Sequence, residues 1–334
     1  MAKGNIIVGC GLAMVDEKIY QDGVILPSPE ELAQYADQHS NTVQVAGGVT
    51  PNIITTLSMI EPNAKVRMVA TVGRDRRGKL YRSQTPNRLG ALAVDSNNDT
   101  GLVVSAVDTK GVVYQRQRNL GAAEHIRIPA ELDPKSIKMF MSDLTTVRLP
   151  KAFDQIDRIL PKINNGDYFL NLAGLNPAIA PPQQVKEMLN SSSREPDIVT
   201  GNEDEFNHLT NSGGFCLEAA VKTFPNTTLL VITRAALGSV IRYQDEIYEL
   251  PPTVVPNEKV VDETGAGDTY AGIMLGYLIT RKRKHWTTRH ILLSCLAASY
   301  GASLAVQTNR TRINKKEVQS VSDQLSFLNK FAEL

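Results

Sequence analysis

Cysteine is scarce in this sequence, and neither sign of charge is in excess. The three cysteines, Cys10, Cys216 and Cys295, are odd in number, widely spaced and without a CxxC pair, which argues against a disulfide framework or a zinc site. We therefore expect a reducing, cytoplasmic location. Lysine and arginine total 36 against 35 acidic residues, a net charge of +1, so the charge balance does not indicate nucleic acid or an anionic membrane as a partner. A small-molecule ligand is expected instead.

Long apolar stretches and internal repeats are also missing. No run of about 18 apolar residues occurs, as a membrane-spanning helix would need, and the apolar run near the N-terminus is too short for a signal peptide. The 334 residues are enough for one large domain with a substantial core. We expect residues 1–334 to form a single domain.

Short β-rich runs alternate with helical patterns along most of the chain. The expected strands are 5–10, 66–73, 138–142, 167–172, 197–200 and 228–233, and the expected helices are 50–60, 151–163, 182–190, 202–210 and 216–224. Such alternation is typical of parallel βαβ units. Three more helical patterns, at 268–282, 287–306 and 314–331, follow. The sequence thus predicts an α/β fold with an open, mostly parallel sheet flanked by helices.

Two stretches, residues 17–46 and 90–120, interrupt the alternation. The second contains GLVVSAVDTKGVVYQRQ, which is typical of a β-hairpin turning at residues 108–111. We expect the two stretches to pair as a small β lid over one edge of the main sheet.

The stretch KVVDETGAGDTYAGIMLGYL, residues 259–278, places a glycine turn directly before an apolar helix. A helix N-terminus carries unsatisfied N–H donors and roughly half a positive charge, so it suits an anion. Gly265, Ala266 and Gly267 leave that backbone accessible, and Asp268 follows at the first helical turn. A carboxylate beside a phosphate site favours phosphoryl transfer. The alternative is that Asp268 only caps the helix.

An amide and a carboxylate stand three residues apart in GNEDEFNHL, residues 201–209. Asn202 and Glu205 share a face where an expected strand leads into a helix. Together they could hold Mg²⁺ through its waters, because magnesium prefers oxygen ligands and keeps much of its hydration. A simple helix cap, Asn with Glu at the third position, is the alternative.

A glycine pair opens another expected helix in VAGGVTPNIITTL, residues 45–57. Gly47 and Gly48 would let a ligand approach the backbone, and Asn52 presents an amide at the same end. Asp16, just after the first expected strand, could accept hydrogen bonds from two sugar hydroxyls. Since ligands bind at the carboxyl ends of strands in open parallel sheets, we expect these residues to meet at one site.

Two other glycine motifs fit phosphate binding less well. In IIVGCGLAM, residues 6–14, Met14 stands where a dinucleotide-binding motif needs its third glycine. In GRDRRGKL, residues 73–80, Leu80 replaces the Ser or Thr of a P-loop. We expect residues 73–80 to be a strand-to-helix turn, with Asp75 near the helix start and Gly78 easing close packing.

Taken together, these motifs resemble those of the ribokinase-like (PfkB) carbohydrate kinase family. The similar stretches include VGRDRRG at 72–78, the Asn202 and Glu205 pair, VITRAALGS at 231–239 and DETGAGD at 262–268. The resemblance runs in order over nearly the whole chain. Within the family, GLAMVDEKI, RNLGAAEHI and PDIVTGNEDEF are most similar to the adenosine kinase subgroup.

The resemblance implies a role for each motif in an ATP-dependent phosphotransferase. Asp268 would be the base that deprotonates a hydroxymethyl group. The other implied roles are an anion hole made by Thr264, Gly265, Ala266 and Gly267, substrate binding by Asp16, Gly47, Gly48 and Asn52, ATP binding by Asn202, Thr233 and Gly238, and a Mg²⁺ site at Glu205 with Asn202, through water. The segments at 17–46 and 90–120 would be a lid that excludes water.

Two positions depart from the family pattern. Leu12 stands where adenosine kinases usually carry a ribose-binding asparagine, and Ala235 stands where the family has a glycine. The expected function is phosphorylation of a nucleoside by ATP, as a monomer or a homodimer. The alternatives are a free-sugar kinase of the ribokinase or fructokinase type, and a protein that binds a nucleotide or sugar without catalysis.

Overall fold

The centre of the molecule is an eight-stranded sheet. The computed structural model describes residues 6–39, 42–90, 92–108, 113–174, 181–211, 213–308, 310 and 312–331. The strand order is β14-β13-β12-β11-β10-β9-β1-β4. In that order the strands are Glu246–Leu250, Ser239–Tyr243, Leu229–Thr233, Ile198–Asn202, Asp167–Asn171, Ile137–Asp143, Ile6–Cys10 and Lys65–Val69. The strands from β12 to β4 are parallel, whereas β13 and β14 are antiparallel additions at one edge.

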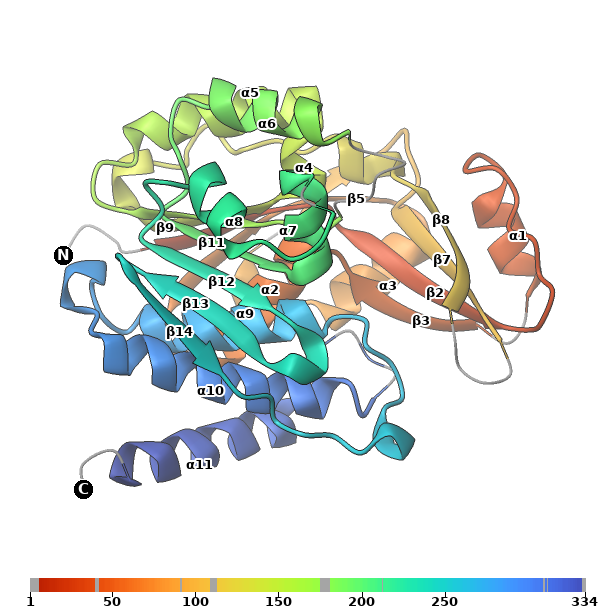
Figure 1. Cartoon of the computed structure of the whole chain (residues 1–334). Helices are drawn as coiled ribbons and strands as arrows, with labels where there is room; N and C mark the ends of the chain where they lie inside the picture. The colour runs from red at the N-terminus through yellow and green to blue at the C-terminus, as the bar shows by residue number, and fades with distance from the viewer. Residues whose placement is uncertain are drawn as a thin grey trace.

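Helices cover both faces of this sheet, as Figure 1 shows. One face carries α4 (Leu144–Val147), α5 (Pro150–Ile159), α6 (Pro182–Ser191), α7 (Glu203–Thr210) and α8 (Leu217–Thr223). The other carries α2 (Val49–Ile60), α9 (Ala266–Leu278) and α10 (Thr288–Ala305), and α11 (Lys315–Phe331) packs outside α10. This is the three-layer solution for a sheet that is apolar on both faces.

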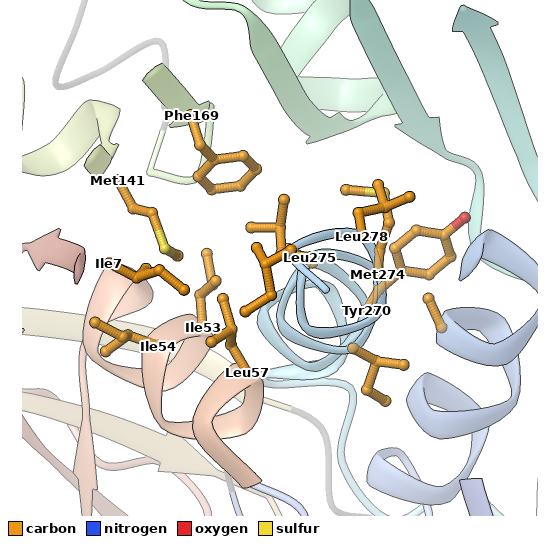
Figure 2. Packing of buried hydrophobic residues seen from close by; sticks show 14 of the residues in the cluster. Ile7, Ile53, Ile54, Leu57, Met141, Phe169, Tyr270, Met274, Leu275 and Leu278 are labelled. Atoms are coloured by element: carbon orange, nitrogen blue, oxygen red, sulfur yellow. The ribbon is translucent and has the colours of Figure 1, made fainter. Parts of the chain in front are cut away.

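Helices α2 and α9 pack closely, and this contact sets where α9 begins. A Cβ atom at Gly272 would lie 2.6 Å from the Cβ of Thr56, and one at Gly276 would lie 2.9 Å from the Cβ of Ile60. These two glycines are four residues apart, so they form one flat strip on α9 against α2. Figure 2 shows the apolar side chains around this contact, including Ile53 and Leu275. Close packing here holds the N-termini of both helices beside the strand ends.

A second, four-stranded sheet lies beyond one end of the main sheet (Figure 1). Its order is β3-β2-β7-β8, with strands Thr42–Gly47, Met14–Tyr20, Gly101–Val107 and Val113–Asn119. Helix α1 (Leu32–Gln38) packs on this sheet through a separate apolar cluster. Nearby, β5 (Thr71–Gly73) pairs with β6 (Ala93–Asp95), and α3 (Arg76–Gln84) follows β5.

The expected α/β fold, the order of the other expected strands and helices and the pairing of the two interrupting stretches are confirmed. The single strand expected at 66–73 is wrong, because the chain breaks at Ala70 into β4 of the main sheet and β5, which pairs with β6 outside it. The hairpin of β7 and β8 forms as predicted, although residues 109–112 of its turn lie outside the described residues. Asp75 caps α3, accepting a hydrogen bond from the Gly78 amide, so residues 73–80 form the expected strand-to-helix turn. The single domain over residues 1–334 stays a prediction. In the described part of the chain, no helix has the length and apolar character needed to cross a membrane.

Other features of the fold, among them helix α1 and the β5–β6 pair, were not predicted. Asp16 lies inside strand β2, not in a loop after the first strand, because the chain turns back into the small sheet within a few residues of β1. The edge hairpin of β13 and β14 was also missed. Its outer strand is partly exposed, with Ile247 53% accessible, so it lacks the continuous apolar run that marks the inner strands.

Candidate active site at the carboxyl ends of the strands

A cavity of about 740 Å³ opens between the main sheet and the small sheet. From the main sheet it is lined by residues at the ends of β9 to β12, and from the small sheet by residues of β2, β7 and β8. The turn before α9 forms a third side. Of the predicted site residues, Asp16, Gly48, Asn202, Glu205, Thr233, Thr264, Gly265, Gly267 and Asp268 line it.

The N-terminus of α9 is open toward this cavity. Gly265 precedes the helix in the left-handed conformation, with φ of 86°, and no side chain caps the helix. The amide of Thr264 donates to Asp262 and that of Ala266 donates to the Glu263 carbonyl. Within the described residues the amides of Gly265 and Gly267 have no such partner. A Cβ atom at Gly267 would meet no atom within 4 Å, so the space before the helix is available to a ligand.

Asp268 sits at the first turn of α9 with its pKa raised to about 7. Burial is the main cause, since it disfavours the charged carboxylate. A hydrogen bond of 2.9 Å from the Asn52 Nδ2 atom opposes the rise, whereas the negative charges of Asp143, Glu205 and Asp16 add to it. A carboxylate poised near neutral pH suits a general base.

Asp16 approaches the cavity from strand β2, with its pKa raised to about 6 by burial. The nearby charge of Arg116 lowers it most, followed by those of Lys18 and Arg312. A Cβ atom at Gly47 would lie 1.8 Å from the Oδ2 atom of Asp16. Gly47 therefore provides the room that the Asp16 carboxylate occupies.

The backbone conformation and a close backbone contact require a glycine at position 48. Its φ is 99°, and a Cβ atom there would lie 1.9 Å from the carbonyl oxygen of Leu12. The sequence suggested that this glycine pair admits a ligand to the backbone. In the structure the space beside Gly47 is occupied by the Asp16 carboxylate, and the space beside Gly48 by the Leu12 carbonyl oxygen.

Asn202 and Glu205 form the capping box of α7. The Asn202 Oδ1 atom accepts from the Glu205 amide at 2.8 Å, and the Glu205 Oε2 atom accepts from the Asn202 amide at 2.9 Å. Burial raises the pKa of Glu205 to about 7, against hydrogen bonds from the backbone of Asn202 and Gly174. Both residues still line the cavity, so the cap and a ligand role are compatible.

The remaining predicted residues lie at the margin of the cavity or outside it. Thr233, at the end of β12, lines the cavity, whereas Gly238 does not. Gly238 has φ of 87°, and a Cβ atom there would lie 2.0 Å from the Leu250 carbonyl oxygen. Ala235, in the same turn, has φ of 46°, a left-handed conformation that is costly for a residue with a side chain. Leu12 is 4% exposed and lines the cavity.

Two polar contacts join the small sheet to the turn before α9. Lys18 of β2 forms a buried ion pair with Asp262. Arg116 of β8 donates to the Thr264 hydroxyl at 3.4 Å. Lys18 shares a face of β2 with Asp16 because side chains alternate along a strand. The small sheet therefore contacts the site on the face that carries Asp16.

Sequence reasoning missed several residues of this site. Asp143, at the end of β9, accepts hydrogen bonds from the Thr50 amide and hydroxyl at 3.1 and 2.6 Å. An aspartate directly after an apolar strand was a signal that could have found it. Arg116 belongs to a hairpin whose face could not be assigned from sequence. Arg312 donates to Asn52 at 2.7 Å, and no local pattern marks it.

Comparisons with known proteins give a consistent result. The sequence pattern described as "pfkB family carbohydrate kinase" matches residues 7–317. A nucleoside kinase of Methanocaldococcus jannaschii is 32% identical over 112 residues, which is 33% of this chain and only 35% of that protein. An adenosine kinase of Schizosaccharomyces pombe is 24% identical over 248 residues, 68% of this chain and 71% of that protein.

A solved structure shares the fold over almost its whole length. The crystal structure of adenosine kinase from Sinorhizobium meliloti superposes with a TM-score of 0.74, covering 97% of this chain and all of that one, at 19% identity. At this level of identity the likeness concerns the fold. It agrees with the confirmed prediction of a mostly parallel sheet flanked by helices.

Proposed function

Because the chain belongs to the pfkB family of carbohydrate kinases, we propose that it is an ATP-dependent kinase that phosphorylates the hydroxymethyl group of a nucleoside. One observation supports this most: Asp268, with a pKa of about 7, stands beside the open N-terminus of α9 in one cavity. A base and an anion site side by side are what transfer of a phosphoryl group to an alcohol needs.

In this proposal Asp268 accepts the proton of the substrate hydroxyl. As that proton leaves, the hydroxyl oxygen forms a bond to the terminal phosphorus of ATP, and the bond between that phosphorus and the bridging oxygen of ADP breaks. Asp268 then holds the proton until it passes to water. Its raised pKa favours proton uptake, and its position among other carboxylates favours the neutral form that results.

The turn before α9 stabilises the charge on the transferred group. The amides of Gly265 and Gly267, which lack partners in the described residues, are the donors best placed to bind it. Thr264 and Ala266 shape the same turn through bonds to Asp262 and Glu263. The partial positive charge of the helix N-terminus adds to these hydrogen bonds.

The substrate hydroxyls bind Asp16, in the pocket that Gly47 and Gly48 shape. Asn52 lies behind Asp268, and Arg116 and Leu12 line the same cavity. An apolar Leu12 leaves one hydrogen bond of the sugar unmade. ATP binds on the side of the cavity near Asn202 and Thr233, and Gly238 shapes the turn after Thr233.

The cavity offers carboxylate and amide oxygens to Mg²⁺, but within the described residues no group of three His, Cys, Asp or Glu side chains lies close enough together to hold a metal ion directly. Burial is the main cause of the raised pKa values of Asp16, Glu205 and Asp268, and nearby negative charge adds to the rise at Asp268, so a bound cation would favour the charged carboxylates. Glu205, with Asn202, would hold the ion through its waters. Bound Mg²⁺ neutralises charge on the phosphate oxygens of ATP.

The segments at about 17–46 and 90–120 act as the lid. The ion pair between Lys18 and Asp262 and the contact of Arg116 with Thr264 tie the small sheet to the phosphate-binding turn. A closed lid keeps water from accepting the phosphoryl group.

The test is ADP release from ATP and Mg²⁺ over a panel of nucleosides and free sugars, with the acceptor-free reaction as blank. Nucleoside-dependent ADP release from the wild type, absent in Asp268→Asn, is expected. Release with ribose or fructose but with no nucleoside would instead support a sugar kinase. The observation behind this alternative is Leu12, which stands where adenosine kinases usually carry a ribose-binding asparagine.

A binding protein without catalysis is the second candidate, and the left-handed Ala235 is the observation in its favour. Such a protein would be thermally stabilised by ATP with Mg²⁺ but would release no ADP with any acceptor. That pair of results would contradict the kinase proposal.

A further inference from the structure

Arg312 lies behind the proposed base, on the segment between α10 and α11. Its Nε atom donates to the Asn52 Oδ1 atom at 2.7 Å, across 260 residues of sequence. The Asn52 Nδ2 atom in turn donates to the Asp268 Oδ2 atom at 2.9 Å. Asn52 is 3% exposed and does not line the cavity. The three side chains therefore form a partly buried hydrogen-bonded series that ends at the carboxylate.

The donor-only chemistry of Arg312 fixes which end of the Asn52 amide faces it. A guanidinium group only donates hydrogen bonds, whereas an amide has one donor end and one acceptor end that can exchange by a flip. Because Arg312 can only donate, the oxygen of Asn52 must face it. The NH₂ group of Asn52 must then face Asp268.

This direction matters for a base. An N–H donor stabilises the unprotonated oxygen of Asp268 and leaves the other carboxylate oxygen to take the substrate proton. A flipped Asn52 would present its oxygen to Asp268 and would stabilise the protonated acid. We propose that Arg312 is a positioning residue that locks the Asn52 amide and thereby keeps Asp268 unprotonated and oriented for phosphoryl transfer. This inference rests on the proposed function.

The surroundings of Arg312 favour a functional role. Its Nη1 and Nη2 atoms are buried and have no hydrogen-bond partner among the described residues. Its guanidinium carbon lies 5.8 Å from the centre of the Tyr81 ring. A cation held here by an aromatic face and by the Asn52 oxygen is placed to act on the carboxylates around it.

The groups that act on Asp268 come from several elements. Asn52 contacts it from α2, and the charges of Asp143, Glu205 and Asp16 act from β9, α7 and β2. Arg312 also lowers the pKa of Asp16 through its charge, whereas its link to Asp268 runs through the Asn52 amide. Removal of Arg312 is expected to raise the pKa of Asp268 further.

The first test compares Arg312→Met with Arg310→Met as the matched control. Arg310 lies on the same segment but pairs with Glu317 at 2.7 Å, away from the site. We expect Arg312→Met to lower kcat by about 10- to 100-fold, with the KM for ATP nearly unchanged. The acidic limb of the kcat profile should move to higher pH. Arg310→Met should keep the wild-type values.

Two further variants separate the control of the Asn52 amide orientation from the size of the side chain at position 312. They also provide a test if Arg312→Met does not fold. Arg312→Lys remains a pure donor and should keep most of the wild-type pH profile. Arg312→Gln can donate or accept, so it no longer dictates the Asn52 flip, and it should behave like Arg312→Met. Equal behaviour of the Lys and Gln variants would overturn the proposal.

A double-mutant cycle tests the route through Asn52. If Arg312 acts through that amide, Arg312→Met combined with Asn52→Ala should be no slower than Asn52→Ala alone. Additive losses would mean that Arg312 acts on the site in another way, and the proposal would fail.

A titration without substrate separates this inference from the proposed function. Carbon NMR of labelled aspartates, with Asp268→Asn for assignment, reports the pKa of Asp268 directly. We expect a similar rise in Arg312→Met and in Asn52→Ala, and no larger rise in the double variant. An unchanged pKa in Arg312→Met contradicts the inference, whereas a wild type that phosphorylates no acceptor contradicts only the proposed function.

Discussion

Two helix N-termini point into the same cavity, and they differ in how their amides are satisfied. At α7, the Asn202 and Glu205 side chains close the capping box. At α9, no side chain caps the helix, and Gly265 turns the chain in the left-handed conformation. Both start at the carboxyl ends of strands, where ligands bind. The closed terminus presents a carboxylate to the cavity, whereas the open one presents free amides.

The difference explains why the glycine turn before α9 is the better candidate for an anion site than the polar motif before α7. At a capped terminus, backbone amides already donate to side chains of the protein, here those of Asn202 and Glu205. An uncapped terminus keeps them for a ligand. Substitutions at α9 should therefore affect catalysis, and substitutions at the cap of α7 should affect stability first.

The largest expected effect is at Asp268. Asp268→Asn keeps the shape and the hydrogen bond from Asn52 but removes the base, so kcat should fall by about 10²- to 10⁴-fold. Circular dichroism and the binding of ATP with Mg²⁺ serve as controls for the fold and the donor site. Wild-type turnover in this variant would reject Asp268 as the base.

The next largest effect is expected from a side chain added at the open N-terminus of α9. A Cβ atom at Gly267 meets no protein atom, so Gly267→Ala should fold normally, and alanine favours the helix. The added methyl group would enter the space before α9. Removal of one anion-hole donor usually costs about 10²- to 10³-fold in kcat, and because Gly267→Ala keeps the amide, we expect a smaller loss of about 10- to 100-fold in kcat/KM. Gly214→Ala, another position with nothing within 4 Å, is the control. Equal activity of the two variants would mean that no ligand uses this space.

The raised pKa of Asp268 also has a consequence for stability. Its pKa rises from 3.8 to about 7 on folding, so the folded state binds more protons between these values and loses stability as pH rises through that window. Asp268→Asn removes this cost. At about pH 8 the variant should be more stable than the wild type by on the order of 2 kcal/mol, and near pH 4 the difference should vanish. Urea unfolding at both pH values measures it, and a pH-independent difference would contradict the assigned cause.

The smallest expected effect is at the capped terminus. Asn202→Ala removes one half of the capping box and should cost about 1 kcal/mol of unfolding free energy. Asn202→Ser retains a capping oxygen and is the matched control, because it should recover most of that loss. A loss of activity without any loss of stability in Asn202→Ala would reverse the contrast between the two helices.

Much of the fold could be predicted because its signals are local. The continuous apolar run of an inner strand such as 167–172 and the period-3.6 pattern of a helix such as 50–60 each extend over a single element. The turn at residues 262–268 and its Asp268 also lie within one short stretch. The edge hairpin of β13 and β14 was not predicted because its outer strand, β14, is half-exposed and shows no continuous apolar run.

The glycines illustrate the limit of sequence reasoning. Gly47 and Gly48 were predicted to bind substrate, and the sequence could not tell that Asp16 and the Leu12 carbonyl oxygen fill the space beside them. Asn52 was interpreted as a substrate ligand, and its two hydrogen bonds to Arg312 and Asp268 appear only in the structure. A side chain's partners depend on elements that arrive from elsewhere in the chain.

The sequence by itself determined the alternation of strands and helices, the glycine turn with Asp268, and the placement of Asn202 and Glu205 at a helix start, because a few neighbouring residues specify each of them. It left open which helix is capped by a side chain, and the structure decided this. Only the tertiary structure decided that Lys18 pairs with Asp262 and that Arg312 reaches Asp268 through Asn52. The physical reason is that such contacts join segments more than 200 residues apart. They exist only once close packing of α2 against α9 and pairing of the small sheet have set those segments side by side.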